Sequence, residues 1–390
     1  MEINHLYYAD CKLTEFTAQV VSCAAAGDRF AVTLSDTAFY PEGGGQACDL
    51  GTLDGVDVLD VQEKDGNIVH TCAAPLAVGK TVTGRIQWER RFDLMQQHTG
   101  EHIVSGIVHK LFGHQNSGFH VGSEMVTVDF DGPIPAEMLP EIELQANRAV
   151  WENIPVNCYI PTPEALPGVF YRAKRPLPWP VRIVEVPGYD SCACCGIHVA
   201  NTGEIGLIKL FSCIKFHQGV RIEMACGKRA LEYMNKIYEQ NKQVSQIFSA
   251  KPLETGAAAK QFSDTLAAEK YRTVALQKQI FRLTADSYAN CENVLHMENG
   301  LTPGNVRDLS ETIAEVCPGI AAVFSPDSDG KMNFCLFSKN QDVKPLGTEL
   351  AGTFAGRGGG KNGCFQGSLL SSEKEISAFF DNHANFFAKK

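Results

Sequence analysis

Two pairs of metal-binding side chains at the same four-residue spacing constrain this chain more than any other feature. His98 and His102 lie in QQHTGEHIVSG, and Cys194 and His198 lie in SCACCGIHVANTGEIG. A four-residue step on a helix puts both imidazoles on one face, about one turn apart. A nitrogen and sulfur pair brought to them by the fold would complete a tetrahedral set that suits Zn²⁺. The sequence therefore predicts one zinc site per chain, built from two distant segments.

Composition narrows the class of protein. The chain has 390 residues, 44% of them hydrophobic, which is enough for about two or three domains with real cores. No stretch approaches the roughly 20 unbroken apolar residues of a membrane span, and the start MEINHLYYADCKLTEF lacks the features of a secretion signal. The 14 cysteines then indicate reduced thiols and a few ligands, not a disulfide framework. We expect a cytoplasmic protein with no membrane partner.

The charge argues against a general polyanion binder but leaves nucleic acid open. The formal net charge is −10, whereas such proteins usually carry a basic surface. Basic side chains nevertheless cluster before each ligand pair: Arg85, Arg90 and Arg91 before the first, and Arg172, Lys174, Arg175 and Arg182 before the second. They are either solvated surface charges or contacts to RNA phosphates.

The order of elements predicts an α+β multidomain fold. Residues 1–86 show the alternation and Gly/Asp turns of an antiparallel barrel or sandwich, interrupted by the glycine-rich motif FYPEGGGQ at residues 39–46. Residues 87–227 predict an α+β domain that contains the zinc site. It begins with an apolar-striped helix over residues 90–113, which ends at Gly113.

Two further regions complete the predicted layout. Residues 228–285 turn helical and break at Lys251-Pro252, which indicates two long helices, either a spacer or an ordinary packed pair. Residues 286–390 predict a small α/β domain with strands in NVLHME, IAAVFSPD and KMNFCLFS. There, Arg357 and Lys361 flank a glycine run whose backbone N–H groups would form an anion nest.

Three ordered motifs resemble one family. HTGEHIVSGIVHKLFG resembles the HTATHLL-type helix of alanyl-tRNA synthetase editing domains, CCGIHVANTGEIGLIKL resembles their CGGTHVxxTGEIG segment, and FYPEGGGQ resembles their glycine-rich motif. RIExxxG from Arg221 to Gly227 also agrees, and GRGGGxxxxxQG from Gly356 to Gly367 is similar to the DHH-associated domain of the synthetase. The aminoacylation domain is absent, so the chain resembles the long-form AlaX proteins, which are free-standing alanyl-tRNA editing hydrolases.

The resemblance implies an activity and a site. The family hydrolyses the ester that joins a wrong amino acid, chiefly serine and sometimes glycine, to tRNA(Ala). By resemblance, His98, His102, Cys194 and His198 are the zinc ligands. Gln46, Gly44 and Gly45 would line the editing pocket near the substrate amino acid. The basic side chains named above, with Arg357 and Lys361, would contact the tRNA, and the C-terminal region would contact the tRNA or form a homodimer.

The chain departs from the family pattern at two positions. Cys195 replaces a glycine and Ile197 replaces a threonine in CCGIH. The change at Ile197 removes a hydroxyl that would bind substrate or position water, so the preference for serine or glycine stays open. Cys195 and Cys192 are alternative candidates for the sulfur ligand, and the spacing to His198 in the family motif favours Cys194.

Alternatives remain at the level of mechanism. Zinc with four protein ligands is usually structural, because catalytic zinc keeps an open position. Either one ligand is displaced, or zinc orders the pocket while a hydrogen-bonded water attacks. A zinc-stabilised RNA-binding protein without catalysis is the second interpretation. A phosphoesterase is disfavoured because the chain has no Asp-His-His triplet, and a threonyl-type editing domain is disfavoured by the glycine-rich motif.

Overall fold

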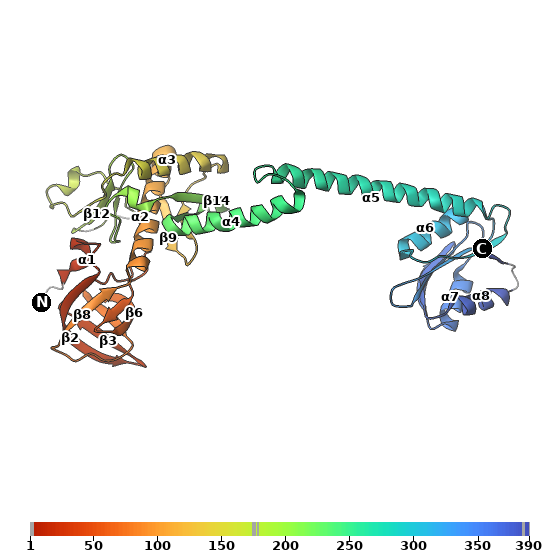
Figure 1. The fold of residues 1–390 in the computed structure, drawn as a ribbon, viewed down its shortest axis with the longest axis horizontal. Coiled ribbons are helices and arrows are strands. Elements are labelled where there is room, and N and C mark those ends of the chain that lie inside the picture. The colour runs from red at the N-terminus through yellow and green to blue at the C-terminus, as the bar shows by residue number, and fades with distance from the viewer. Residues whose placement is uncertain (1–3, 174–176, 178, 384–386, 390) are drawn as a thin grey trace. The chain divides into compact units, whose positions relative to one another are not determined.

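The structure, a computed structural model, describes residues 4–173, 177, 179–383 and 387–389. Contacts divide the chain into two compact units, Met1–Val244 and Ser245–Lys390 (Figure 1). The fold is a mixed α+β multidomain arrangement, as predicted. The finer division at residues 86, 227 and 285 remains a prediction, and Lys174 and Arg175 lie outside the described residues.

The first unit begins with a closed six-stranded barrel, so the barrel is the correct one of the two predicted alternatives. Alternating apolar residues explain it: in the first half of β2, every second side chain points inward, including Phe16, Ala18 and Val20. Its strands, in barrel order, are β2 (Glu15–Ala26), β3 (Arg29–Leu34), β7 (Asn67–Cys72), β6 (Val56–Lys64), β5 (Gly51–Leu53) and β8 (Thr81–Ile86). The short elements β1 (Asn4–His5), α1 (Leu6–Ala9) and β4 (Asp36–Thr37) flank it.

A long helix, α2 (Trp88–Phe112), follows the barrel and enters a second α+β layer (Figure 1). It ends at Gly113, whose φ of 74° is the left-handed conformation that glycine adopts easily. A four-stranded sheet packs on it in the order β14 (Ile208–Phe216), β15 (Gly219–Cys226), β10 (Val126–Phe130) and β9 (Asn116–Val121). A three-stranded sheet contains β11 (Asn157–Tyr159), β12 (Ile183–Val186) and β13 (Asp190–Ala193). The helical elements here are α3 (Leu139–Glu152), η1 (Ala136–Met138), η2 (Leu166–Gly168) and η3 (Thr202–Ile205).

Two long helices occupy the predicted spacer. They are α4 (Gly227–Phe248) and α5 (Thr255–Asp286), and the chain breaks between them at the predicted Lys251-Pro252 step. Both are mostly solvent-exposed, with Ala230 the buried residue of α4 and Phe281 and Ala285 those of α5.

The second unit is a sheet covered on both faces. The strand order is β19 (Arg357–Lys361), β20 (Cys364–Leu369), β18 (Met332–Phe337), β17 (Ala321–Pro326), β16 (Asn293–Met297) and β21 (Phe387–Lys389). One apolar cluster joins the sheet to α6 (Pro303–Ile313) and the end of α5, and the other joins it to α7 (Lys344–Thr353) and α8 (Glu373–Asp381).

One local prediction is wrong. Arg357–Lys361 forms the edge strand β19, paired with β20, and is not an anion nest. A nest requires alternating backbone conformations, and no glycine of this strand has a positive φ. Among the described residues, no helix is both long and apolar enough to cross a membrane. All 14 cysteines are free thiols, as expected.

Candidate active site and metal-binding cluster

Helix α2 and the loop after β13 bring the four predicted ligands together. His98 and His102 lie one turn apart on α2 and are 2% and 3% exposed. Strand β13 delivers Cys194 and His198 to the same place. One nitrogen or sulfur atom from each of the four lies within 4.8 Å of the others, so the group could hold a metal ion. Cys194 Sγ, for example, lies 3.4 Å from His98 Nε2.

Each histidine of the cluster is held from behind through Nδ1. His98 Nδ1 donates to Gln46 Oε1 (2.8 Å), and His102 Nδ1 donates to Asp190 Oδ2 (3.1 Å). The Thr99 hydroxyl donates to a backbone carbonyl, so its oxygen accepts from His198 Nδ1 (3.2 Å). These bonds select the tautomer with Nε2 unprotonated, which is the form that binds a metal. His198 Nε2 is buried and has no partner among the described residues.

Electrostatics favour the thiolate at Cys194. Burial alone would raise its pKa, but the charges of His98 and His102 and two hydrogen bonds lower the pKa well below its usual value. Burial and the proximity of His98 lower the pKa of His198 well below normal, which favours its neutral form. At His102 the direction is opposite: burial alone would lower its pKa, but the Cys194 thiolate and the Asp190 carboxylate raise that pKa well above its usual value. A thiolate and neutral imidazoles are the protonation states of metal ligands, so metal binding would release the proton of His102.

The alternative cysteines are not members of this group of four. Cys192 groups only with His102 and Asp190, and Cys195 belongs to neither group. Cys195 is exposed, and its backbone carbonyl accepts a hydrogen bond from Tyr8 (2.7 Å). The geometry therefore agrees with the choice of Cys194.

The glycine-rich motif packs against the cluster where only glycine fits. Gly45 has a φ of 85°, and a Cβ there would lie 2.5 Å from the ring of Phe119. A Cβ at Gly196, next to Cys195, would lie 2.1 Å from His98. Gln46 connects both loops, since its Oε1 also accepts from the backbone N–H of Ile197 (3.2 Å). Side chains at Gly45 and Gly196 would push the cluster apart.

A pocket of about 350 Å³ opens beside the cluster. Gly44 lines this pocket, whereas Gln46 is not among its lining residues and is buried. Ile197 is also buried, in the apolar core, so the residue that replaces the family's threonine does not face the pocket. The residues that line the pocket are Gly44, His98, Glu101, His102, Asn116, Phe119, Ala173, Leu177, Cys192, Ala193, Cys194 and Cys195.

Two predicted phosphate contacts are buried ion pairs instead. Arg91 is fully buried, bonds Asp49, and donates to the Leu13 carbonyl at 2.9 Å. Arg172 forms a two-bond pair with Asp190 (2.7 and 2.9 Å). Neither guanidinium is free to bind a phosphate, which corrects the prediction for these two residues.

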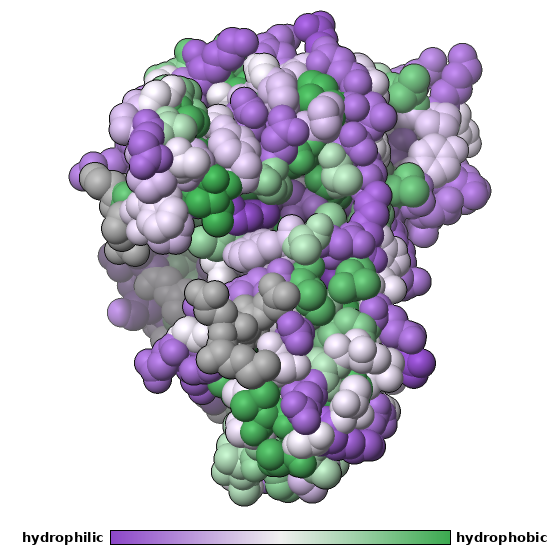
Figure 2. All heavy atoms as spheres, turned by 90° about the vertical axis from the view of Figure 1, so that its left-hand side faces the viewer, coloured by the Kyte–Doolittle hydropathy of each residue, from purple (hydrophilic) through white to green (hydrophobic). Residues whose placement is uncertain are grey.

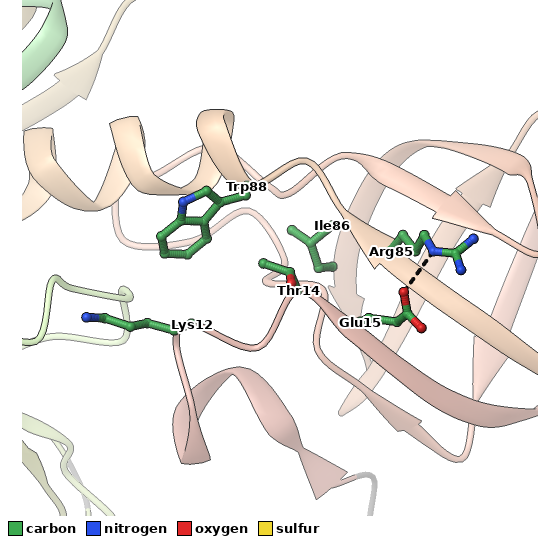
Figure 3. A pocket seen from close by; sticks show the side chains of 6 residues that line it. All are labelled: Lys12, Thr14, Glu15, Arg85, Ile86 and Trp88. Atoms are coloured by element: carbon green, nitrogen blue, oxygen red, sulfur yellow. Dashed lines mark hydrogen bonds and ion pairs between the residues drawn. The ribbon is translucent and has the colours of Figure 1, made fainter.

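The other predicted contacts differ in their accessibility. Arg182 donates to the carbonyls of Cys194 and Gly196 (2.9 and 2.8 Å), so it holds the ligand loop. Arg90 is partly buried and donates to a backbone carbonyl. Arg85 is exposed and pairs with Glu15, pointing away from Trp88 in Figure 3. Arg357 and Lys361 are exposed on β19.

Sequence reasoning missed three residues of the site: Glu101, Asn116 and Asp190. Glu101 carried a signal, because it lies three residues after His98 and therefore on the same helix face. Asp190 is four residues before Cys194 on a strand, and no motif marked it. Asn116 reaches the site only through the packing of β9 on α2, which has no local signature.

Two family models match parts of the chain. The model for the second additional domain of threonyl and alanyl tRNA synthetases matches residues 181–243, which contain Cys194 and His198. The model for class II (A) tRNA synthetases matches residues 4–90, which contain the barrel.

Curated relatives match nearly the whole chain. Alanyl-tRNA editing protein Aarsd1-B of Xenopus laevis is 30% identical over 395 residues, covering 94% of each chain. Alanyl-tRNA editing protein AlaX-L of Pyrococcus horikoshii is 27% identical and covers 96% of each. An alanine–tRNA ligase of Ignicoccus hospitalis is 36% identical over 262 residues, which are 64% of this chain and 29% of that protein.

The barrel, the matched domain and the relatives together define an enzyme of the aminoacyl-tRNA hydrolase class. The chain belongs to the family of alanyl-tRNA editing proteins, as its motifs predicted.

Proposed function

We propose that this enzyme is a trans-editing hydrolase that removes the amino acid from mischarged tRNA(Ala), chiefly serine and also glycine, with one zinc ion per chain. The observation that carries the proposal is the cluster of three oriented imidazoles and one thiolate at the wall of a pocket of about 350 Å³. A separate editing site has a physical reason, because a synthetase pocket rejects small near-isosteres of its amino acid poorly by binding alone.

The cluster residues fit zinc. The donor set of one sulfur and three imidazoles matches Zn²⁺, and the unpartnered Nε2 of His198 is a buried acceptor that a cation would satisfy. His98, His102, Cys194 and His198 would hold the ion. When bound, it would supply a Lewis acid for the ester carbonyl or for water.

The remaining residues prepare the pocket. Gln46, Thr99 and Asp190 fix the three imidazoles, so the cluster keeps its geometry when substrate enters. Phe119 stacks on His98 with ring centroids 5.1 Å apart and, with Leu177 and Ala173, gives the pocket apolar walls. Such walls restrict water to the site of attack.

The amino-acid preference would depend on Cys195 more than on Ile197. Cys195 lines the pocket, whereas Ile197 is buried in the core. The missing threonine hydroxyl therefore does not enlarge the pocket or change its polarity. The Cys195 side chain occupies space that a glycine at this position would leave open.

Of the predicted phosphate contacts, the exposed Arg85, Arg357 and Lys361 and the partly buried Arg90 are the described side chains that remain. The tRNA would be bound by a few such contacts, by backbone groups and by shape, as RNA duplexes usually are. Figure 2 shows that one face of the molecule mixes hydrophilic and hydrophobic residues. A modest electrostatic contribution agrees with the net charge of −10.

The test is deacylation of Ser-tRNA(Ala), Gly-tRNA(Ala) and Ala-tRNA(Ala) by the zinc-loaded enzyme and by His102→Ala. We expect fast loss of serine, slower loss of glycine and retention of alanine, all abolished in the variant. Hydrolysis of all three esters at equal rates would contradict editing.

A second candidate function follows from the count of four protein ligands. A closed zinc site is usually structural, so the chain would then be a zinc-stabilised RNA-binding protein without catalysis. Binding of tRNA(Ala) without turnover of any ester would support this candidate and contradict the first.

A further inference from the structure

One wall of the pocket carries a carboxylate that the catalytic proposal does not use. Glu101 lies on α2 directly before His102, is 4% exposed, and lines the pocket. The Ser105 hydroxyl and Asn116 Nδ2 both donate to its Oε1. Its other oxygen, Oε2, accepts no hydrogen bond from the described residues.

The orientation of Asn116 follows from this contact. A carboxylate only accepts, so the amide nitrogen must face Glu101 and Oδ1 must face away. Asn116 Oδ1 is buried and has no partner in the described part of the chain. Asn116 lines the same pocket. Two neighbouring residues of the pocket wall therefore each have an acceptor without a donor, and one of these acceptors belongs to an anionic group.

Glu101 is also exceptional among the buried acids. Three carboxylates are buried in the described residues: Asp49, Glu101 and Asp190. Asp49 pairs with Arg91 and Asp190 pairs with Arg172, whereas Glu101 forms no direct ion pair within the described residues, although its charge acts on His102 and Arg172 from a greater distance. Burying a carboxylate without a direct ion pair is unfavourable, so this position is suited to a cation that arrives with a ligand.

We propose that Glu101 and Asn116 form the subsite that binds the α-ammonium group of the aminoacyl ester. This inference rests on the proposed function. An ammonium group carries a positive charge and three donors with no acceptor, which matches a carboxylate and an unpaired amide oxygen. The serine hydroxyl is neutral and has one hydrogen to donate, so it would satisfy only one of the two acceptors.

The location agrees with this role. Glu101 and the cluster residues His98, His102 and Cys194 line one pocket, so an amino acid held at its ammonium keeps its ester within that pocket. A fixed ammonium also gives the substrate a single orientation, and such positioning is a large part of catalysis. Correctly charged and mischarged tRNA share this group, so the subsite orients the substrate and does not select serine.

Two adenosine analogues with a non-hydrolysable 3′-amide test the subsite. One carries serine, and the other carries the same acid with a hydroxyl in place of the α-amine. For the zinc-loaded wild type we expect calorimetry to show about ten-fold tighter binding of the amine analogue, because the contact is charge-assisted. In Glu101→Gln the ratio should fall to within about two-fold, and in Asn116→Ala to about three-fold.

The matched control is Glu223→Gln. Glu223 also accepts from a serine hydroxyl, that of Ser212 (2.7 Å), but it lies outside the pocket. The control should keep the wild-type ratio. Zinc content, measured on each variant by mass spectrometry, should stay at one per chain.

Three results would overturn the subsite. They are an unchanged ratio in Glu101→Gln, equal binding of both analogues to the wild type, or no binding of either. If Glu101→Gln does not fold, Asn116→Ala decides alone, because it removes the free acceptor and leaves the charge. Hydrolysis of Ser-tRNA(Ala) is measured separately: a wild-type preference for the amine without turnover contradicts the proposed function but not the subsite, and turnover without preference contradicts only the subsite.

Discussion

Helices α2 and α5 both depart from the usual pattern of apolar side chains inside and polar side chains outside. Helix α2 buries many polar side chains, whereas α5 exposes many apolar ones. The buried side of α2 includes Arg91, Gln96, Gln97, His98, Thr99, Glu101, His102 and Ser105, all polar. Helix α5 exposes Phe262, Leu266, Tyr271, Val274, Leu276, Ile280 and Leu283, all apolar or aromatic. Buried polar groups and exposed apolar groups are the informative exceptions in a folded protein.

The two exceptions have different physical meanings. On α2, nearly every buried polar group has a specific partner. Gln97, for example, bonds the backbone of Cys226 in both directions, at 3.0 and 2.7 Å. Such pairing offsets the loss of hydration and fixes a single geometry. The apolar groups of α5 remain mostly exposed in the described residues, although the ring of Phe262 contacts that of Phe248 on α4. The buried polar side chains of α2 therefore indicate a functional site, and the exposed apolar side chains of α5 indicate a surface that another molecule could cover.

The largest expected effect lies at the cluster, where Cys194→Ser and Cys195→Ser distinguish two adjacent thiols. Cys194→Ser should reduce bound zinc below one per chain and lower the deacylation rate at least about 100-fold, because a hydroxyl is a poor zinc ligand. Cys195→Ser should keep full zinc and change the rate by less than about five-fold, since its thiol is exposed and outside the cluster. Metal analysis measures the zinc content of both variants, and single-turnover kinetics measure their deacylation rates. Loss of zinc and activity in Cys195→Ser but not in Cys194→Ser would identify Cys195 as the ligand.

The next effect concerns two ion pairs of identical geometry. Arg172–Asp190 is buried, whereas Arg221–Asp129 is partly exposed, and both are held by bonds of 2.7 and 2.9 Å. Asp190→Asn leaves a buried guanidinium unpaired and should lower the free energy of unfolding by about 3–5 kcal/mol. Asp129→Asn should lower it by less than about 1 kcal/mol.

Urea unfolding of both variants measures the difference. Asp190→Asn should also weaken zinc binding by about 10-fold or more, since Asp190 orients His102. Equal losses in the two variants would show that burial of the pair has no influence.

The sequence predicted the parts of the site that local spacing determines. The step from His98 to His102 and the ends of α2 follow from helix periodicity and from Gly113. The break between α4 and α5 follows from Pro252. The barrel strands follow from alternation. Each of these depends on neighbours a few residues away, so one sequence is sufficient.

Partnerships between distant residues were not predictable in the same way. Arg91 looked like a surface cation beside the ligands, but Asp49 and three backbone carbonyls enclose it. Ile197 looked like a change in the pocket, but the loop turns it into the core. A charge pattern does not reveal which charges have buried partners, because those partners come from other strands. The Glu101–Asn116 pair depends on α2–β9 packing in the same way.

His70 is a buried histidine of the barrel that lies outside the metal-binding cluster. It therefore tests whether a buried imidazole can be stabilised by hydrogen bonds alone. His70 Nδ1 donates to the Val32 carbonyl (3.1 Å), and Nε2 accepts from the Thr37 hydroxyl (2.8 Å). Burial lowers the pKa of His70 to about 4. In the unfolded chain His70 has the ordinary histidine pKa near 6.5, so below that pH the unfolded chain binds more protons than the folded one. Stability is therefore lost as the pH falls from 6.5 toward 4.

At pH 5, this group should lower the free energy of unfolding by roughly 2 kcal/mol relative to pH 7.5. His70→Gln removes the titrating group. The difference in unfolding free energy between wild type and variant should therefore change by roughly 2 kcal/mol between pH 7.5 and pH 5. His120→Gln, at an exposed position of β9, is the control and should show no such shift. A wild-type and His70→Gln difference that does not depend on pH would contradict the buried neutral imidazole.

The smallest effect on stability is expected on α5. Ile280 is half exposed, so Ile280→Lys should change the unfolding free energy of the second unit by less than about 0.5 kcal/mol. Its neighbour Phe281 is buried against α6, and Phe281→Ala should lower the same quantity by about 3–5 kcal/mol. The sequence predicts a homodimer through the C-terminal region, residues 286–390, and helix α5, which directly precedes that region, offers an exposed apolar surface for a contact between two copies of the chain. We therefore expect light scattering to show a wild-type dimer and an Ile280→Lys monomer with unchanged deacylation. A monomeric wild type would mean that the exposed apolar side chains of α5 serve no contact between two copies of this chain.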